Sequence, residues 1–122
     1  MDPHANPMAD WFESMRRIPQ IVPDDVLVMP AHNECFRGLH ARITHLLEGQ
    51  DAALGKLREL LAEPKRAVDT FATLFRRPVR ETVGTQLGLA TGEATACLNY
   101  LASRGDVNIE VADGVAWYRL RR

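Results

Sequence analysis

Apolar side chains recur at helical spacing near the start of the chain. Asn6 suits the N-cap position and Pro7 suits the first position of a helix, so we expect a helix to begin here. Pro19 is expected to end it. The apolar stripe of this helix consists of Met8, Trp11, Phe12, Met15 and Ile18. Such a stripe must pack on another surface, yet the sequence shows no element that is clearly shaped to receive it.

The next apolar segment, residues 26–29, is a short continuous run between two aspartates and Pro30. A run of this kind is typical of a strand that is buried on both faces. A single strand cannot satisfy its own backbone donors and acceptors, and no second strand is predicted nearby. We therefore expect this strand to belong to a sheet whose other strands lie outside the chain.

A helical pattern predominates over residues 36–63, and Pro64 is expected to end it. Gly49 and Gly55 each weaken this helix by about 1 kcal/mol relative to alanine, which leaves a kink or a break open. A shorter helix is expected over residues 68–75. Its inward side chains are expected to be Val68, Phe71, Ala72 and Phe75.

A further helix is expected to begin near Thr82. Its apolar stripe consists of Val83, Leu87, Ala90, Ala94, Leu98 and Leu101. Gly84, Gly88 and Gly92 form a row on another face, which Ala96 continues. Small residues let another backbone approach closely, so we expect this row to mark the tight packing of a neighbouring helix.

The end of the chain predicts a β-hairpin. Gly105 is the glycine expected just after a helix end, and residues 107–111 then alternate between apolar and polar side chains. Asp113-Gly114 is a strong turn dipeptide, and residues 115–119 alternate on the return. Three helices followed by a two-stranded hairpin is the order of a winged-helix unit. The sequence thus predicts a mainly α chain with a small β component.

Composition and charge narrow the class of protein. The 122 residues are 46% hydrophobic and carry a net charge of −1, which is ordinary for a globular chain and gives no support for nucleic-acid binding. No apolar run approaches the ~20 residues that a membrane span needs, and the start lacks the features of a signal peptide. We therefore expect a cytoplasmic protein with no membrane partner. Cys35 and Cys97 lie far apart, as expected of two free thiols.

Several segments, taken in order, resemble one enzyme superfamily. Pro30-Ala31-His32, directly after the short apolar run, resembles the last metal-ligand motif of the metallo-β-lactamase superfamily. Residues 36–43 look like the start of a helix in the branch of these hydrolases that carries a C-terminal, winged-helix-like domain. Residues 6–11 with Ser14-Met15 resemble the helix before the metal-ligand strand. Residues 87–94 and 98–101 resemble the long helix of the C-terminal domain.

The resemblance implies a division of the chain into three parts. Residues 1–35 would be a helix-strand remnant of the αββα catalytic sandwich, residues 36–63 a connecting long helix, and residues 64–122 a winged-helix-like domain of three helices and a β-hairpin. It also implies zinc-dependent hydrolysis of a thioester, ester or lactam-like bond in a small-molecule substrate by the intact protein. The C-terminal unit would then cover the mouth of the site or shape the substrate entrance.

His32 is the single metal ligand that the resemblance carries over. The superfamily's main metal motif, His-x-His-x-Asp-His, is absent from the chain. His40 and His45 lie about 140° apart around the axis of the predicted helix, so they do not share a face. A zinc site needs about three protein ligands. We therefore expect no bound zinc and no hydrolysis by this chain alone.

Three further residues are candidates for the substrate entrance: Asn33, Arg37 and His40. Asn33 stands where the family usually has glycine, and asparagine is the next best residue for positive φ although it adds bulk. Arg37 is expected either to cap or ion-pair near the entrance or to be a solvated surface side chain. His40 is expected to pack or to form a hydrogen bond near the domain junction.

Two alternative functions stay open. A winged-helix unit is a common DNA-binding module, but the exposed positions of its helix lack basic side chains, and we do not expect DNA binding. Those positions are Thr85, Gln86, Thr91, Glu93 and Thr95, and the basic residues beyond them are Arg119, Arg121 and Arg122. The other alternative is a protein-interaction module, in which the apolar helix face left bare by the missing sandwich pairs two copies.

Overall fold

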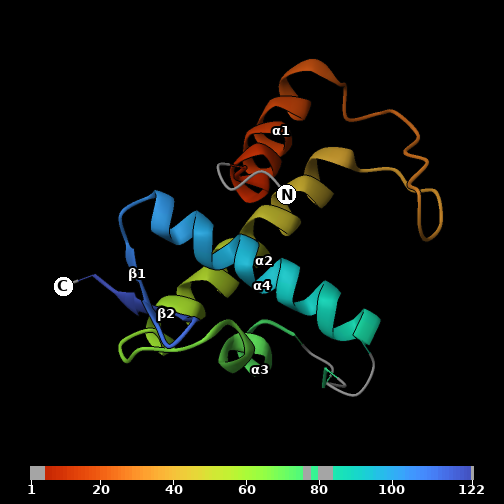
Figure 1. Ribbon diagram of the computed structural model, residues 1–122. Coiled ribbons are helices and arrows are strands. Elements are labelled where there is room, and N and C mark those ends of the chain that lie inside the picture. The colour runs from red at the N-terminus through yellow and green to blue at the C-terminus, as the bar shows by residue number, and fades with distance from the viewer. Residues whose placement is uncertain (1–4, 76–77, 80–83, 122) are drawn as a thin grey trace.

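The computed structural model describes residues 5–75, 78–79 and 84–121 of the chain (Figure 1). Most of the described chain is helical, and its two strands form one small antiparallel sheet. The elements in order are α1 (Pro7–Ile21), α2 (Leu39–Leu60), η1 (Ala67–Thr70), α3 (Phe71–Leu74), α4 (Gly84–Ser103), β1 (Val107–Ala112) and β2 (Val115–Leu120). The predicted mainly α chain with a small β component is confirmed.

Helix α1 begins where the sequence predicts. The side chain of Asn6 accepts a hydrogen bond from the backbone N–H of Ala9 at 3.2 Å. The expected end at Pro19 is wrong, because the helix continues to Ile21. Proline removes one donor from the last turn, but the N–H of Val22 still donates to the carbonyl of Ile18 at 2.8 Å and closes the helix.

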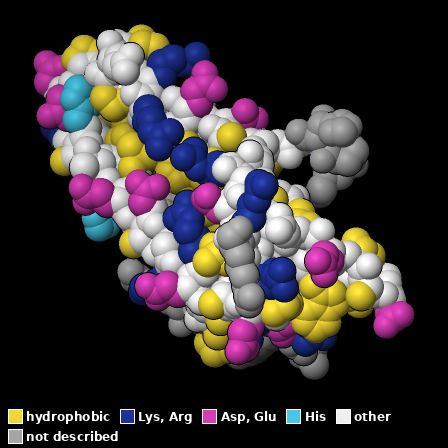
Figure 2. All heavy atoms as spheres, turned by 90° about the vertical axis from the view of Figure 1, so that its left-hand side faces the viewer, with side chains coloured by type: hydrophobic (Ala, Val, Ile, Leu, Met, Phe, Trp, Pro, Cys, Tyr) yellow, Lys and Arg dark blue, Asp and Glu magenta, His cyan; other side chains and the backbone are white. Residues whose placement is uncertain are grey.

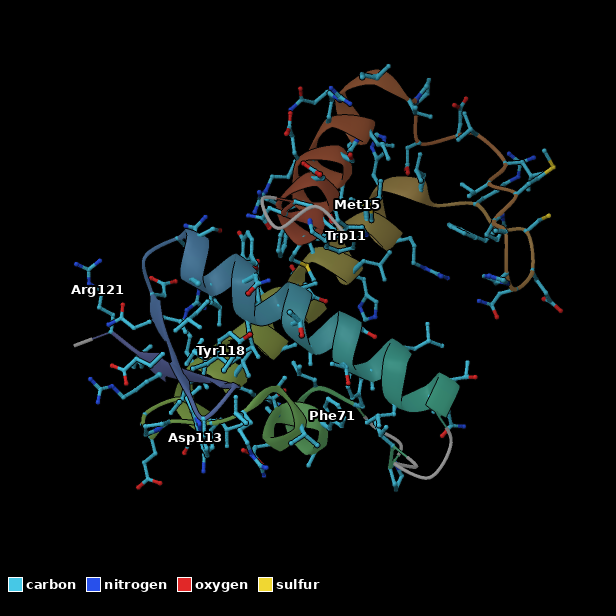
Figure 3. All side chains as sticks on the ribbon, in the orientation of Figure 1. Trp11, Met15, Phe71, Asp113, Tyr118 and Arg121 are labelled. Carbon is cyan, nitrogen blue, oxygen red and sulfur yellow. The ribbon has the colours of Figure 1, made fainter. Side chains whose placement is uncertain are left out.

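The apolar stripe of α1 packs on elements that lie far along the chain. Phe12 is only 1% exposed, and its ring centroid lies 5.2 Å from that of Tyr100 in α4. Trp11 packs against the same core, and Figure 3 shows it on the side of α1 that faces α2. The expectation that this chain offers no surface for the stripe is therefore wrong. That surface is assembled from α2 and α4, which no local pattern could reveal.

One main core joins α1, α2, α4 and the hairpin. Its buried members are Phe12, Leu54, Leu57, Leu61, Cys97, Leu98, Tyr100, Leu101, Val107 and Tyr118. A smaller cluster of Phe71, Ala90 and Ala94 lies between α3 and α4. The buried stripe predicted for α4 is confirmed from Ala90 onward, whereas Val83 and the predicted start at Thr82 lie outside the described residues.

Helix α2 begins later and ends earlier than the predicted range 36–63. It begins at Leu39 because Gly38 takes a left-handed conformation, with φ of 85°. Neither Gly49 nor Gly55 breaks it. The following turn passes Pro64 and joins the sheet edge, where Lys65 and Tyr118 exchange backbone hydrogen bonds at 2.8 and 2.9 Å.

The single helix predicted over residues 68–75 is instead the 3₁₀ turn η1 followed by the short helix α3. The Asp69 carboxylate accepts hydrogen bonds from the backbone N–H and the guanidinium of Arg66. These hydrogen bonds between residues three apart favour a tight turn. Phe71 is buried as predicted, but Ala72 is exposed, because the change of helix type rotates it outward.

The apolar run of residues 26–29 is not the predicted strand buried on both faces. Val28 forms an isolated bridge with Phe36, and the two exchange hydrogen bonds at 2.8 and 3.1 Å. Leu27 is 51% exposed and Met29 is 77% exposed. No further strand lies beside this run among the described residues. The run instead pairs, through Val28, with Phe36 at the other end of the same loop.

The predicted hairpin is confirmed. Gly105 has φ of 81°, and the N–H of Asp106 reaches back to the carbonyl of Leu101 at 3.0 Å, which ends α4 in a Schellman motif. Asp113 and Gly114 both have positive φ, as a two-residue hairpin turn of type I′ requires. Figure 3 shows Asp113 at the tip of the hairpin and Tyr118 turned toward the helices.

Candidate functional site

The α1–α2 loop, residues 22–38, carries the residue that the sequence marks as a metal ligand. His32 lies in the exposed part of this loop. It borders an open hollow of about 570 Å³, together with Asn33. The other lining residues of this hollow are Val28, Pro30, Glu34, Cys35, Phe36, Arg42 and Leu46. Figure 1 shows the loop extending away from the helices beyond the ends of α1 and α2.

Asn33 adopts the backbone conformation that the sequence allows for it. Its φ is 71°, in the left-handed region that glycine and asparagine tolerate best. The asparagine side chain is exposed beside His32. His32 and Asn33 thus line the same hollow, and their roles as ligand and entrance residue stay predictions.

The described residues do not by themselves fit a metal centre. No group of three or more His, Cys, Asp or Glu side chains is placed to hold a metal ion among the residues that the structure covers. Zinc sites in proteins have about three or four protein ligands. Among the described residues, His32 would therefore be a single zinc ligand without the others that a zinc site needs.

Arg37 and His40 are engaged at the base of the loop. The Arg37 guanidinium donates from Nη1 to the backbone carbonyl of Asp25 at 2.8 Å. The Nε2 atom of His40 lies 2.8 Å from the carbonyl oxygen of Val22. A carbonyl oxygen only accepts hydrogen bonds, so Nε2 is the donor. His40 thus forms a hydrogen bond, as expected, while the domain junction near which it was expected stays a prediction.

Asp24 is a residue of this site that sequence reasoning missed. Its Oδ1 accepts a hydrogen bond from the backbone N–H of His40 at 2.9 Å. The available signal was Gly38, which precedes α2 and has no side chain to cap the helix, so the first N–H groups need a partner from elsewhere. Nothing in the local sequence indicates that the partner is Asp24.

The two cysteines differ in their surroundings, and both are free thiols, as predicted. Cys35 is exposed in the α1–α2 loop, whereas Cys97 is buried in the core. Burial, together with the smaller effect of the Glu93 charge, raises the pKa of the Cys97 thiol to about 11, against the opposing effect of the hydrogen bond from Gln50. Cys97 is therefore a protonated core side chain at neutral pH.

The glycine row of α4 borders an open groove. A Cβ atom added at Gly84, Gly88 or Gly92 would meet nothing within 4 Å, so no neighbouring helix packs on this row among the described residues. The expectation of tight packing there is wrong for this part of the chain. The groove measures about 840 Å³, and Ala5 and Pro7 also line it. The pairing of two copies stays a prediction.

Among the described residues, the face that carries the hairpin shows no continuous basic patch. Figure 2 shows Lys and Arg side chains in a broken row over this face, with acidic and apolar side chains between them. Arg58 is paired with Asp106 at 3.1 Å, which neutralises one of the cations. On α4, Glu93 is exposed as expected. These features give no support to DNA binding, which depends on cations facing the phosphates.

None of the described helices is long and apolar enough to cross a membrane.

Comparisons with known proteins point to one family. The profile of the family described as "Metallo-beta-lactamase-like, C-terminal domain" matches residues 54–121. A β-lactamase domain protein from Burkholderia ambifaria is similar over 99% of this chain, with 38% identity and a TM-score of 0.87. A metallo-β-lactamase family protein from Thermus thermophilus is similar over 95%, with 25% identity and a TM-score of 0.76.

The similarity covers only part of those two proteins. The chain spans 36% of the Burkholderia protein and 34% of the Thermus protein, about a third of each. No curated protein is significantly similar to the chain. The matched family segment begins inside α2. For the first 53 residues, the similarity is therefore to the two solved structures alone.

Proposed function

Because the chain belongs to the metallo-β-lactamase-like family, we propose that it acts as the C-terminal part of a zinc-dependent hydrolase. The 38% identity with the Burkholderia protein over 99% of the chain carries this proposal. That match extends beyond the C-terminal family domain and includes the loop with His32. The proposed substrate is a small molecule with a thioester, ester or lactam-like bond.

The exposed apolar side chains around the α1–α2 loop support the proposal. Ile21 is 69% exposed, Leu27 51% and Met29 77%. Clustered exposed apolar side chains commonly mark an interaction surface. In the proposed hydrolase this surface packs against the catalytic sandwich. The run of residues 26–29 then gains the neighbouring strands that its pattern predicts.

His32 is the proposed contribution of this chain to the metal site. The sandwich would have to supply the remaining ligands, because zinc needs about three from the protein and the described residues hold no such group. For the same reason we expect no hydrolysis by the 122 residues alone. Asn33, beside His32, is the proposed entrance residue that contacts the substrate.

The part of the chain after α2 is the proposed winged-helix-like cover of the site. Its elements follow the order of such a unit, with helices before a two-stranded hairpin. The three-part division at residues 35 and 63 stays part of the proposal. A winged-helix order does not by itself imply DNA binding.

The first test uses the purified chain with added zinc and generic thioester and β-lactam substrates. We expect no turnover above the buffer rate at any zinc concentration. The proposal in its present form is contradicted by turnover that the substitution His32→Ala removes and the control His45→Ala leaves unchanged, since one ligand would then suffice. His45 is a suitable control because it is exposed on α2 and does not line the hollow.

A further inference from the structure

The base of the α1–α2 loop is closed by three polar contacts between its first residues and the segment around the start of α2. The His40 N–H donates to Asp24 Oδ1 at 2.9 Å. The His40 ring donates through Nε2 to the carbonyl of Val22 at 2.8 Å. The Arg37 guanidinium donates to the carbonyl of Asp25 at 2.8 Å. Together these contacts form a clasp, a name used below for the side chains of Asp24, Arg37 and His40.

The clasp satisfies backbone groups that the helix ends leave open. The first N–H groups of a helix have no partner within it, and Gly38 at the N-cap of α2 has no side chain to accept from them. Asp24 supplies the missing acceptor, and its negative charge suits the N-terminal end of the helix dipole. Val22 is the C-cap residue of α1, so the His40 ring links the end of one helix to the start of the next.

Further into the loop, beyond the clasp, its two strand-like segments are joined by a second set of hydrogen bonds. Val28 and Phe36 exchange backbone hydrogen bonds at 2.8 and 3.1 Å. The guanidinium of Arg42 lies over the Phe36 ring, 4.4 Å from its centroid, and fastens that bridge to α2. The described hydrogen bonds include none from the side chains of the segment between Val28 and Phe36, so the path of this segment depends on the contacts below it.

We infer that Asp24, Arg37 and His40 are positioning residues, which fix the α1–α2 loop and thereby the place of His32. His32 lies in the segment that the Val28–Phe36 bridge closes, so any widening at the base shifts it. On this account, Arg37 and His40 act through the backbone of the loop and do not touch the substrate. The inference rests on the proposed role of His32 for its functional meaning, but its test needs neither metal nor substrate.

The test compares amide hydrogen exchange in the full 122-residue chain for three clasp variants and three matched controls. The clasp variants are Asp24→Ala, Arg37→Ala and His40→Ala, and the controls are Asp25→Ala, Arg17→Ala and His45→Ala. Asp25 is a sharp control for Asp24, because it is adjacent, equally charged and contributes only its backbone carbonyl. We expect about tenfold faster exchange of the Val28 and Phe36 amides in each clasp variant, as the loss of one hydrogen bond predicts.

Conservative variants separate a positional role from general destabilisation. Asp24→Asn keeps a carbonyl acceptor and His40→Gln keeps a side-chain N–H donor, so both are expected to restore at least half of the lost protection. Exchange of the α4 amides is expected to stay within about twofold of the wild type. These amides exchange only when the main core unfolds, and the clasp lies outside that core. Unchanged Val28 and Phe36 amides would overturn the inference, as would equal acceleration in α4.

The place of His32 has a direct readout in the NMR signals of its imidazole C–H groups. We expect these signals to move in His40→Ala, to return in His40→Gln and to keep their positions in His45→Ala. If exchange at the bridge accelerates while the His32 signals stay in place, the loop is fastened by the clasp but His32 is not positioned by it, and the inference is overturned. A failure of zinc binding or hydrolysis in the proposed hydrolase changes none of these readouts.

Discussion

The ring of Phe12 lies 5.2 Å from the ring of Tyr100, centroid to centroid, and the two planes are tilted by 32°. This contact joins the first helix of the chain to α4, the helix that leads into the hairpin. Both side chains belong to the main core, with 1% and 7% of their surfaces exposed. The N-terminal helix is thus an integral part of the fold of this chain.

Replacing Phe12 by alanine tests this integration. Removing a buried phenylalanine leaves a cavity, so we expect a loss of about 3–5 kcal/mol in the free energy of unfolding, measured in urea. The control is Ile21→Ala, at the exposed end of the same helix, with an expected change of at most about 0.5 kcal/mol. Equal, small effects of the two substitutions would show that α1 is not docked on the core.

The groove on α4 allows a prediction of opposite sign. Gly88→Ala removes a flexible residue from a helix, and the added methyl group meets nothing within 4 Å. We therefore expect a gain of about 0.5–1 kcal/mol in the free energy of unfolding. The matched control, Gly105→Ala, is expected to destabilise the chain, because Gly105 has φ of 81°.

The Gly88 substitution also tests whether two copies pair through the glycine row, which is a different surface from the apolar helix face on which pairing is predicted. If a second copy packs on the glycine row, the added methyl group weakens that contact, and the measured stability falls in a way that depends on protein concentration. Urea unfolding at two concentrations, together with the elution volume in gel filtration, separates this outcome from the expected gain.

The fold could be predicted from the sequence where the signals are local. The apolar stripe of α4, the Schellman glycine Gly105 and the Asp113-Gly114 turn each depend on side chains within a few positions, and the structure has all three. The partners of α1 could not be predicted, because Phe12 meets Tyr100 through tertiary packing that leaves no periodic pattern. The strand predicted over residues 26–29 is wrong for a related reason. Its composition suits a sheet, but burial depends on neighbours that composition does not specify.

The candidate site divides in the same way. His32 and Asn33 are candidates through the resemblance to a short motif, and both line one hollow, but their roles stay predictions. Asp24 was missed because its hydrogen bond to the His40 backbone spans 16 positions. A helix that begins after glycine signals that a distant cap is needed, but it does not identify the residue that provides it.

The two thiols are expected to respond differently to pH and to alkylation. Burial raises the pKa of the Cys97 thiol from 9.0 to about 11, so the folded state favours the protonated form. The stability from this difference is present below pH 9 and is lost as pH rises toward 11. Urea unfolding over this range is expected to show a smaller loss in Cys97→Val than in the wild type or in Cys35→Ser. Burial also raises the pKa of Tyr118, so the difference between variants is the quantity to compare.

Labelling with a thiol reagent checks the same assignment at neutral pH. The exposed Cys35 is expected to react in the folded chain, whereas Cys97 is expected to react only after unfolding in urea. Rapid modification of Cys97 in the native protein would contradict its place in the core.

The most direct test of the central claim joins this chain to the part of the Burkholderia ambifaria protein that it does not cover. The product is purified with zinc, and its zinc affinity and its hydrolysis of a generic thioester are measured for the wild type, His32→Ala and His45→Ala. The account predicts zinc binding and hydrolysis in the wild type and in His45→Ala. It predicts zinc affinity at least about tenfold weaker in His32→Ala, with hydrolysis lost. Equal zinc affinity and equal hydrolysis in His32→Ala and His45→Ala would contradict it.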